Sequence, residues 1–233
     1  MKRQNWSGWA PLGSGGPSLQ LGTDNVAASD HVRDLGVMIS LDLSLDKHVC
    51  NVCAKCFFLA SLRQVRRSLD VESVKTLVHA FVTTRLDYYN SVLAGAPRSV
   101  TDKLQRALNA AARLVSGTRK FDRGLSRLLH VDLHWLDVPE RVQYKLGITV
   151  HRCQQHKAPQ YLTDCYTSRG QRLRSASRHQ LFVLRYQLSS LGRRSFAVAG
   201  PTTWNSLSAD LRDLTCSDES FRRSLNTFLF SEY

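Results

Sequence analysis

The stretch that decides the fold covers residues 69–117 and reads LDVESVKTLVHAFVTTRLDYYNSVLAGAPRSVTDKLQRALNAAARLVSG. Its first half carries an apolar and aromatic stripe at three- and four-residue steps, which is typical of an amphipathic helix. Asp70 is the expected N-cap, and Pro97 ends the helix because it disfavours helical geometry at Ala96. The stripe consists of Val71, Val74, Leu77, Val78, Phe81, Val82, Arg85, Tyr88, Tyr89 and Val92.

The second half of this stretch predicts another amphipathic helix, from about Ser99 to its C-terminal stop at Gly117. Its apolar face consists of Val100, Leu104, Ala107, Leu108, Ala111, Leu114 and Val115. A different face carries Lys103, Arg106 and Arg113. We expect the apolar faces to join the two helices and the basic face to remain open to a partner.

Upstream, residues 45–69 predict a further helix with basic residues at its end, namely Arg63, Arg66 and Arg67. Cations at this position complement the negative end of the helix dipole, and they can equally contact the backbone of a nucleic acid. The sequence leaves both interpretations open. Downstream of Gly117, the basic surface continues with Arg119, Lys120 and Arg123.

The cysteines allow two metal hypotheses, and we favour neither. The run Cys50-x-x-Cys53-x-x-Cys56 resembles an iron–sulfur motif but lacks the fourth cysteine and the proline that follows it. We expect these three sulfurs to lie along the buried face of a helix instead. A second possible ligand set is scattered around a helix by its spacing and consists of His151, Cys153, His156 and Cys165. We therefore predict no metal and no cofactor.

Later parts of the chain give weaker signals. The run Asp137-Val138-Pro139-Glu140 predicts a helix start, with Asp137 as N-cap and Glu140 at the capping-box position. Residues 180–186 and 195–198 predict strands or extended runs, and residues 217–230 predict a final amphipathic helix. Near the N-terminus, residues 18–21 and 31–39 predict the two strands of a small hairpin.

Charge and composition narrow the class of partner. The 233 residues include 32 Lys and Arg against 19 Asp and Glu, so the formal charge is +13 and a polyanionic partner is the first expectation. Six cysteines fit a reducing compartment better than a secreted disulfide framework. No segment has the roughly 18 apolar residues of a membrane span, and no signal peptide is evident. We expect no membrane partner and an intracellular location, either nuclear or cytoplasmic.

Several motifs together resemble a known family. The runs LVHAFVTTRLDYYN (77–90), KLQR (103–106) and NAAARLV (109–115), with Gly117 and RKFD (119–122), look like the region after the polymerase palm in LINE-type (non-LTR) retrotransposon reverse transcriptases. The likeness is closest to the jockey-like and chicken-repeat-like clades. It extends upstream to VRDLGV (32–37) and downstream to HWL (134–136), WNSL (204–207) and LR (211–212), so it covers nearly the whole chain after about residue 18.

The resemblance implies a domain organisation and a role. Residues 1–18 are a flexible leader, and 19–43 are a β-hairpin remnant of the edge of the palm that holds the primer. Residues 44–131 form a thumb-like helical domain, and 132–233 form the region after the thumb. The implied fold is mainly α, with the N-terminal hairpin, an amphipathic helical bundle and a short β segment near the C-terminal end.

In that family this region holds template and primer. We therefore expect non-sequence-specific binding of RNA or an RNA–DNA duplex, with a reverse transcriptase palm domain as a further expected partner. The expected nucleic-acid-binding residues are Arg63, Arg66, Arg67, Lys103, Arg106, Arg113, Arg119, Lys120 and Arg123.

Catalysis is not expected from this chain. Reverse transcription needs metal-binding carboxylates in the palm, which in this family include an Asp-Asp dipeptide, and the sequence has none. No endonuclease signature and no Gly-x-Ser-x-Gly motif occur either. The sequence thus indicates a non-catalytic fragment of an RNA-directed DNA polymerase. The alternatives are an interaction or structural module without nucleic-acid affinity of its own, and a degenerate translated element with no function.

Overall fold

The computed structural model describes residues 18–26, 29–56, 58–119, 121–167, 179–186, 192–231 and 233. Helices make up most of this part of the chain, and its strands lie near the N-terminus, which confirms the mainly α fold with small N-terminal hairpins. The chain divides into two compact units, Met1–His48 and Val49–Tyr233, with the boundary inside helix α1 (Asp46–Lys55). Of the expected leader, residues 1–18, only Ser18 lies within the described residues.

The first unit contains two short antiparallel hairpins instead of the one that was predicted. Strand β1 (Leu19–Leu21) pairs with β2 (Asp24–Val26), and β3 (His31–Asp34) pairs with β4 (Val37–Ser40). The expected pairing of residues 18–21 with 31–39 is therefore wrong. Leu35 and Gly36 have φ values of 44° and 84°, and two successive positive values are what a tight two-residue turn between antiparallel strands requires. Residues 31–39 consequently fold back on themselves.

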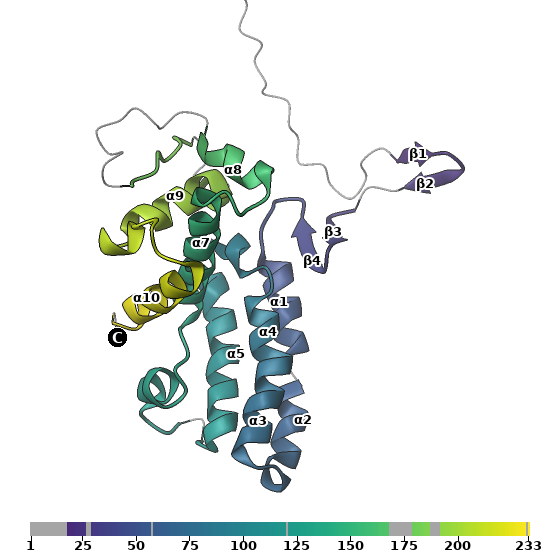
Figure 1. Cartoon of the computed structure of the whole chain (residues 1–233). Helices are drawn as coiled ribbons and strands as arrows, with labels where there is room; N and C mark the ends of the chain where they lie inside the picture. Colours follow the sequence, from purple (N-terminus) through teal and green to yellow (C-terminus); the bar gives the residue numbers. More distant parts are fainter. Residues whose placement is uncertain are drawn as a thin grey trace, which may run out of the picture. The chain divides into compact units, whose positions relative to one another are not determined.

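The second unit begins with a bundle of helices around α5 (Figure 1). Its elements are α2 (Phe58–Val65), the 3-10 turn η1 (Arg66–Ser68), α3 (Val71–Val78), the π-helical turn η2 (His79–Thr83), α4 (Thr84–Asp87), the 3-10 turn η3 (Asn90–Leu93) and α5 (Arg98–Ser116). Helices α2 and α3 both pack against α5. The buried side chains of α3, η2, α4 and α5 include Val74, Val78, Val82, Leu86, Val100, Leu104, Leu108, Ala111 and Val115. This core confirms the apolar face of α5 and the middle of the first predicted stripe, whereas Val71, Tyr88 and Tyr89 of that stripe are exposed.

The first predicted helix ends earlier than its apolar stripe suggests. Regular helix stops at Asp87, because Tyr88 is extended and Tyr89 takes a left-handed conformation with φ 57°. The chain then makes the turn η3, in which Asn90 is buried. This break places Asp87 and Asn90 beside the start of α7 (Val138–Gln154), where both form hydrogen bonds.

The C-terminal half packs around α7. Helices α9 (Phe196–Ser206) and α10 (Asp218–Phe230) both lie against it, and α7 also contacts α5 and η3. The shorter elements of this half are α6 (Leu125–Arg127), the π-helical turn η4 (Leu128–Asp132), α8 (Gln160–Thr167), and the 3-10 turns η6 (Gly192–Arg194) and η7 (Asp210–Arg212). One apolar cluster fills the interior and consists of Leu136, Val150, Trp204, Leu207, Leu211, Phe221, Leu225 and Leu229.

The two predicted helix caps have different outcomes. Asp70 caps α3 as expected, since its carboxylate accepts from the amides of Glu72 and Ser73 at 3.0 and 3.1 Å. Asp137 occupies the N-cap position of α7, but its side chain makes no capping hydrogen bond. Gln105 of α5 supplies the cap instead: its Oε1 accepts from the amide of Val138 at 2.9 Å, and its Nε2 donates to Asp137 Oδ1 at 2.7 Å.

The short β segment expected near the C-terminal end is wrong within the described residues. Residues 181–186 form no strand, and 196–198 belong to helix α9. The backbone of Leu181 bonds the side-chain amide of Asn205 in place of a neighbouring strand, since its N–H donates to Oδ1 and its carbonyl accepts from Nδ2, both at 2.8 Å. Because a side chain satisfies these backbone groups, no second strand is needed.

Candidate nucleic-acid interface

At one end of the helical bundle, Arg66 joins η1 to the last turn of α5. Its guanidinium donates from Nε to the Leu114 carbonyl at 3.0 Å, from Nη1 to Leu69 at 3.1 Å and from Nη2 to Val115 at 3.1 Å. Leu114 and Val115 lie in the last turn of α5, where carbonyls lack helical partners and the dipole favours a cation. Arg66 therefore fixes η1 to the C-terminal end of α5. Arg66 thus has a structural role, and its contact with nucleic acid stays a prediction.

This connection places other predicted arginines at the same end of the bundle. Arg63 and Arg67 are exposed on the segment that carries Arg66, while Arg113 is partly buried in the last turn of α5. After the C-cap Gly117, Arg119 and Arg123 follow as exposed residues. Figure 1 shows the C-terminal ends of α2 and α5 at the same end of the bundle. We call these residues the bundle-end cluster, and it consists of Arg63, Arg67, Arg113, Arg119 and Arg123.

Among the described residues, none of the five arginines of the bundle-end cluster forms an ion pair. Asp122 accepts a hydrogen bond from the backbone amide of Arg119 at 2.6 Å, a contact that shapes the loop. Unpaired cations on separate segments but at one end of a bundle can neutralise several phosphates at once. Lys120, a further predicted contact, lies outside the described residues.

Lys103 and Arg106 lie farther from this end. Along α5, Lys103 and Arg113 are ten residues apart, which corresponds to about 15 Å. Lys103 leans toward α1, with its Nζ 3.8 Å from Cys50 Sγ, while Arg106 is exposed. Arg106 and Arg113, seven residues apart, differ by only about 20° in direction, whereas Lys103 is rotated by about 60° from Arg106. Arg106 and Arg113 thus lie on one side of α5, as predicted, and Lys103 lies at the edge of that side.

The three-cysteine run does not form a buried stripe. Cys56 is buried, Cys53 is partly buried and Cys50 is exposed, so the expectation that all three line the core is wrong. The reason is geometric: each step of three residues falls about 60° short of a full helical turn, so two steps rotate the side chain by about 120°. Burial raises the pKa of the Cys53 thiol, an effect that the neighbouring thiol of Cys50 adds to and that Arg106 and Lys103 oppose.

Burial has the largest effect on the pKa of the two buried thiols, Cys56 and Cys153. It raises the pKa of Cys56 to about 11 and that of Cys153 likewise to about 11, which keeps both thiols protonated near neutral pH. A protonated thiol is a poor metal ligand. In the described part of the chain, no group of three or more His, Cys, Asp and Glu side chains is arranged to hold a metal ion. The prediction that the protein takes no metal remains to be tested by metal analysis.

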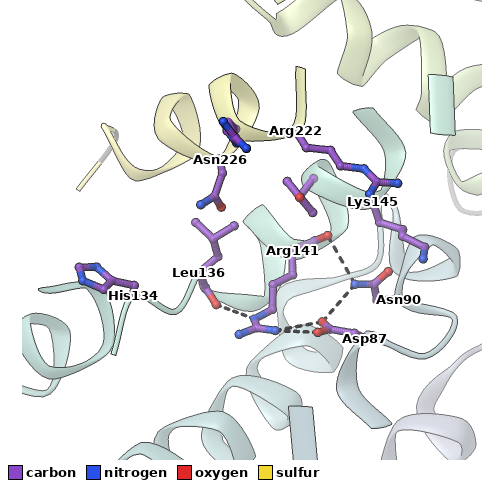
Figure 2. Close-up of a pocket in the computed structure, with 10 residues that line it drawn as sticks. Asp87, Asn90, His134, Leu136, Arg141, Lys145, Arg222 and Asn226 are labelled. Carbon is purple, nitrogen blue, oxygen red and sulfur yellow. Dashed lines mark hydrogen bonds and ion pairs between the residues drawn. The ribbon is translucent and has the colours of Figure 1, made fainter. Parts of the chain in front are cut away.

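A second basic region, which the sequence did not indicate as a site, surrounds a pocket of about 470 Å³ between the α4–η3 segment, α7 and α10 (Figure 2). Its polar and charged lining residues include Asp87, Asn90, His134, Arg141, Lys145, Arg222, Arg223 and Asn226. The available signal was the i, i+4 spacing of Arg141 with Lys145 and of Arg222 with Asn226, which places each pair on one side of its helix. Nothing in the sequence shows that these two sides face the same pocket.

Comparison of the chain with protein-family models, with curated proteins and with solved structures finds no match. The resemblance to LINE-type reverse transcriptases therefore rests on the motifs quoted above. No described helix combines the length and the apolar character that crossing a bilayer requires.

Proposed function

We propose that the chain is a non-catalytic nucleic-acid-binding segment that holds the sugar–phosphate backbone of RNA or of an RNA–DNA duplex. The observation that carries this proposal is the bundle-end cluster, whose five arginines lie in or follow the ends of α2 and α5 and form no ion pair among the described residues. The formal charge of +13 adds a long-range attraction for polyanions.

The chemistry of the cluster favours backbone contacts over base recognition. Guanidinium groups bind phosphate oxygens in a bidentate way, and such contacts fix the position of a duplex without reading its sequence. The motif resemblance supports the same conclusion, because the corresponding region of LINE-type reverse transcriptases holds template and primer. A palm domain, supplied by another chain or a longer product, is the protein partner that fits this role.

An equilibrium binding experiment tests the proposal. Fluorescence anisotropy of a labelled RNA–DNA duplex is measured against the full chain at increasing salt, with two duplexes of unrelated sequence. We expect similar affinities for both duplexes and a linear fall of log K with log salt, since phosphate contacts release counterions. Polyglutamate serves as a control polyanion, and we expect it to compete poorly because it lacks phosphate geometry.

The alternative is a module that packs on a partner protein and has no nucleic-acid affinity of its own. It predicts no saturable duplex binding at moderate salt, or binding that polyglutamate displaces as well as nucleic acid does. Either result would contradict the proposed function.

A further inference from the structure

The pocket between the α4–η3 segment, α7 and α10 has a rigid floor. Arg141 Nη1 donates to both carboxylate oxygens of Asp87, at 3.1 and 2.8 Å, while its Nε donates to the carbonyl of Leu136 at 2.7 Å. The buried Asn90 donates from Nδ2 to the carbonyl of Arg141 at 3.4 Å. Figure 2 shows these bonds converging on Arg141. Asp87, the one carboxylate among the described residues that line the pocket, is therefore already paired with Arg141, which is itself held by further hydrogen bonds.

The opposite wall is fixed by close packing of α10 on α7. A Cβ added at Gly147 would lie 2.9 Å from Cδ2 of Leu225, so a larger residue in place of Gly147 would push the helices apart. Leu225 is fully buried, as are its neighbours along α10, Phe221 and Leu229. Because this apolar side of α10 is anchored, Arg222 and Asn226 are held at the pocket. The distance between the two walls is thus set by the core and not by a ligand.

Both walls of the pocket carry positively charged side chains. Lys145 lies one turn after Arg141 on α7, and Arg222 lies on α10 across the pocket (Figure 2). Within the described ranges, no carboxylate lies within ion-pair distance of either Lys145 or Arg222. Arg223, also in the lining, pairs with Glu219. Lys145 and Arg222 are exposed, and two like charges beside one cavity repel each other, so an anion between them offsets that repulsion.

We propose that this pocket binds a phosphate group. A phosphate presents several acceptor oxygens around one centre, so it can accept from Lys145 and Arg222 at the same time, with Asn226 as a further donor, whereas a carboxylate has only two oxygens. The group is presented either by a nucleic-acid strand or by a free phosphate ester. Binding of a nucleic-acid strand rests on the proposed function, because the strand would then extend from the bundle-end cluster to a second contact. Binding of a free phosphate ester is independent of the proposed function.

The test uses the full chain with the variant K145Q/R222Q, which removes the two unpaired charges and leaves the Asp87–Arg141 pair intact. The matched control is R33Q/K47Q, which loses the same charge from two exposed residues of the first unit. Isothermal titration calorimetry measures the Kd of inorganic phosphate at constant ionic strength. We expect wild type and control to bind alike, and the Kd of K145Q/R222Q to rise about tenfold or more. Equal affinity in all three proteins overturns the proposal.

The source of the phosphate is resolved by repeating the duplex titration with the same proteins. A strand in the pocket predicts that K145Q/R222Q lowers the salt slope of duplex binding by about one to two units relative to R33Q/K47Q. An unchanged slope, together with lost binding of inorganic phosphate, supports a free phosphate ester. If wild type binds no duplex but K145Q/R222Q still loses phosphate binding, the pocket is supported while the proposed function fails.

Discussion

Three arginines near the end of α2 look equivalent in the sequence, and the structure separates them. Arg66 points into the bundle and bonds three backbone carbonyls, whereas Arg63 and Arg67 remain exposed. Arg66 thus interacts with a helix end, but mainly with that of α5 rather than that of its own segment, and contact with a partner stays a prediction for Arg63 and Arg67. The i, i+3 spacing alone could not show this, because two of the three partner carbonyls, those of Leu114 and Val115, belong to a helix that begins over thirty residues later.

Arg66→Ala is expected to lower the free energy of unfolding by roughly 2 kcal/mol, because carbonyls in the last turn of α5 lose a charged donor. Urea denaturation followed by circular dichroism measures the change. Arg63→Ala, which removes an exposed arginine from the same segment, is the control and should change stability by less than about 0.5 kcal/mol. Equal effects of the two substitutions would show that Arg66 is no more structural than its neighbour.

At the scale of elements, apolar periodicity predicted where most helices lie, but it did not predict which groups cap them or where turns interrupt them. The face of α5 is buried as expected, and so are Val74 and Val78 of α3, although Val71 at its start is exposed; steps of three and four residues report on which side meets the core. Periodicity carries no information on what satisfies a helix end, and so Gln105 rather than Asp137 caps α7. Nor does it reveal the Tyr89 turn, where a non-glycine residue is held at φ 57° by the fold around it.

The contact between α7 and α10 includes a buried histidine with a pH-dependent contribution to stability. His151 stacks on Phe221 with ring centroids 4.1 Å apart, and its Nδ1 lies 3.8 Å from Asp218 Oδ1. Burial lowers the pKa of His151 below its usual 6.5, Asp218 acts to raise it, and Lys157 acts to lower it further. The folded state therefore favours the neutral imidazole. Its stabilising contribution is complete above the unfolded pKa and is lost as pH falls from about 6.5 through the folded value.

The expected result is a free energy of unfolding that falls as the pH decreases below about 6.5, with a His151 contribution of at most about 1.4 kcal/mol per pH unit. Urea titrations across this range measure the slope. His151→Gln should flatten it, while His79→Gln, at an exposed position of η2, should not. The same slope in wild type and His151→Gln would exclude the imidazole as the source.

At the scale of the whole molecule, the sequence predicted a basic, mainly helical protein, but it did not predict which of the cationic side chains lack an ion-pair partner. The formal charge of +13 is a property of composition. Which cations remain unpaired depends largely on tertiary contacts: Arg141 is bound by Asp87 and Lys157 by Asp218. The segment η1 meets the last turn of α5 because Arg66 bonds its carbonyls, and Lys145 and Arg222 share a pocket because α10 packs on α7. Such pairings across long stretches of sequence leave no local pattern.

The central claim is that the bundle-end cluster contacts the nucleic-acid backbone, and the salt dependence of binding tests it most directly. The variant R63Q/R67Q/R113Q removes three cluster charges and spares Arg66, and R33Q/K47Q/R185Q removes the same charge from exposed residues elsewhere. If each arginine neutralises one phosphate, the log–log salt slope for an RNA–DNA duplex should fall by about two to three units in the cluster variant and stay near wild type in the control. Equal slopes in the two folded variants would contradict the account and show that the cluster is only solvated.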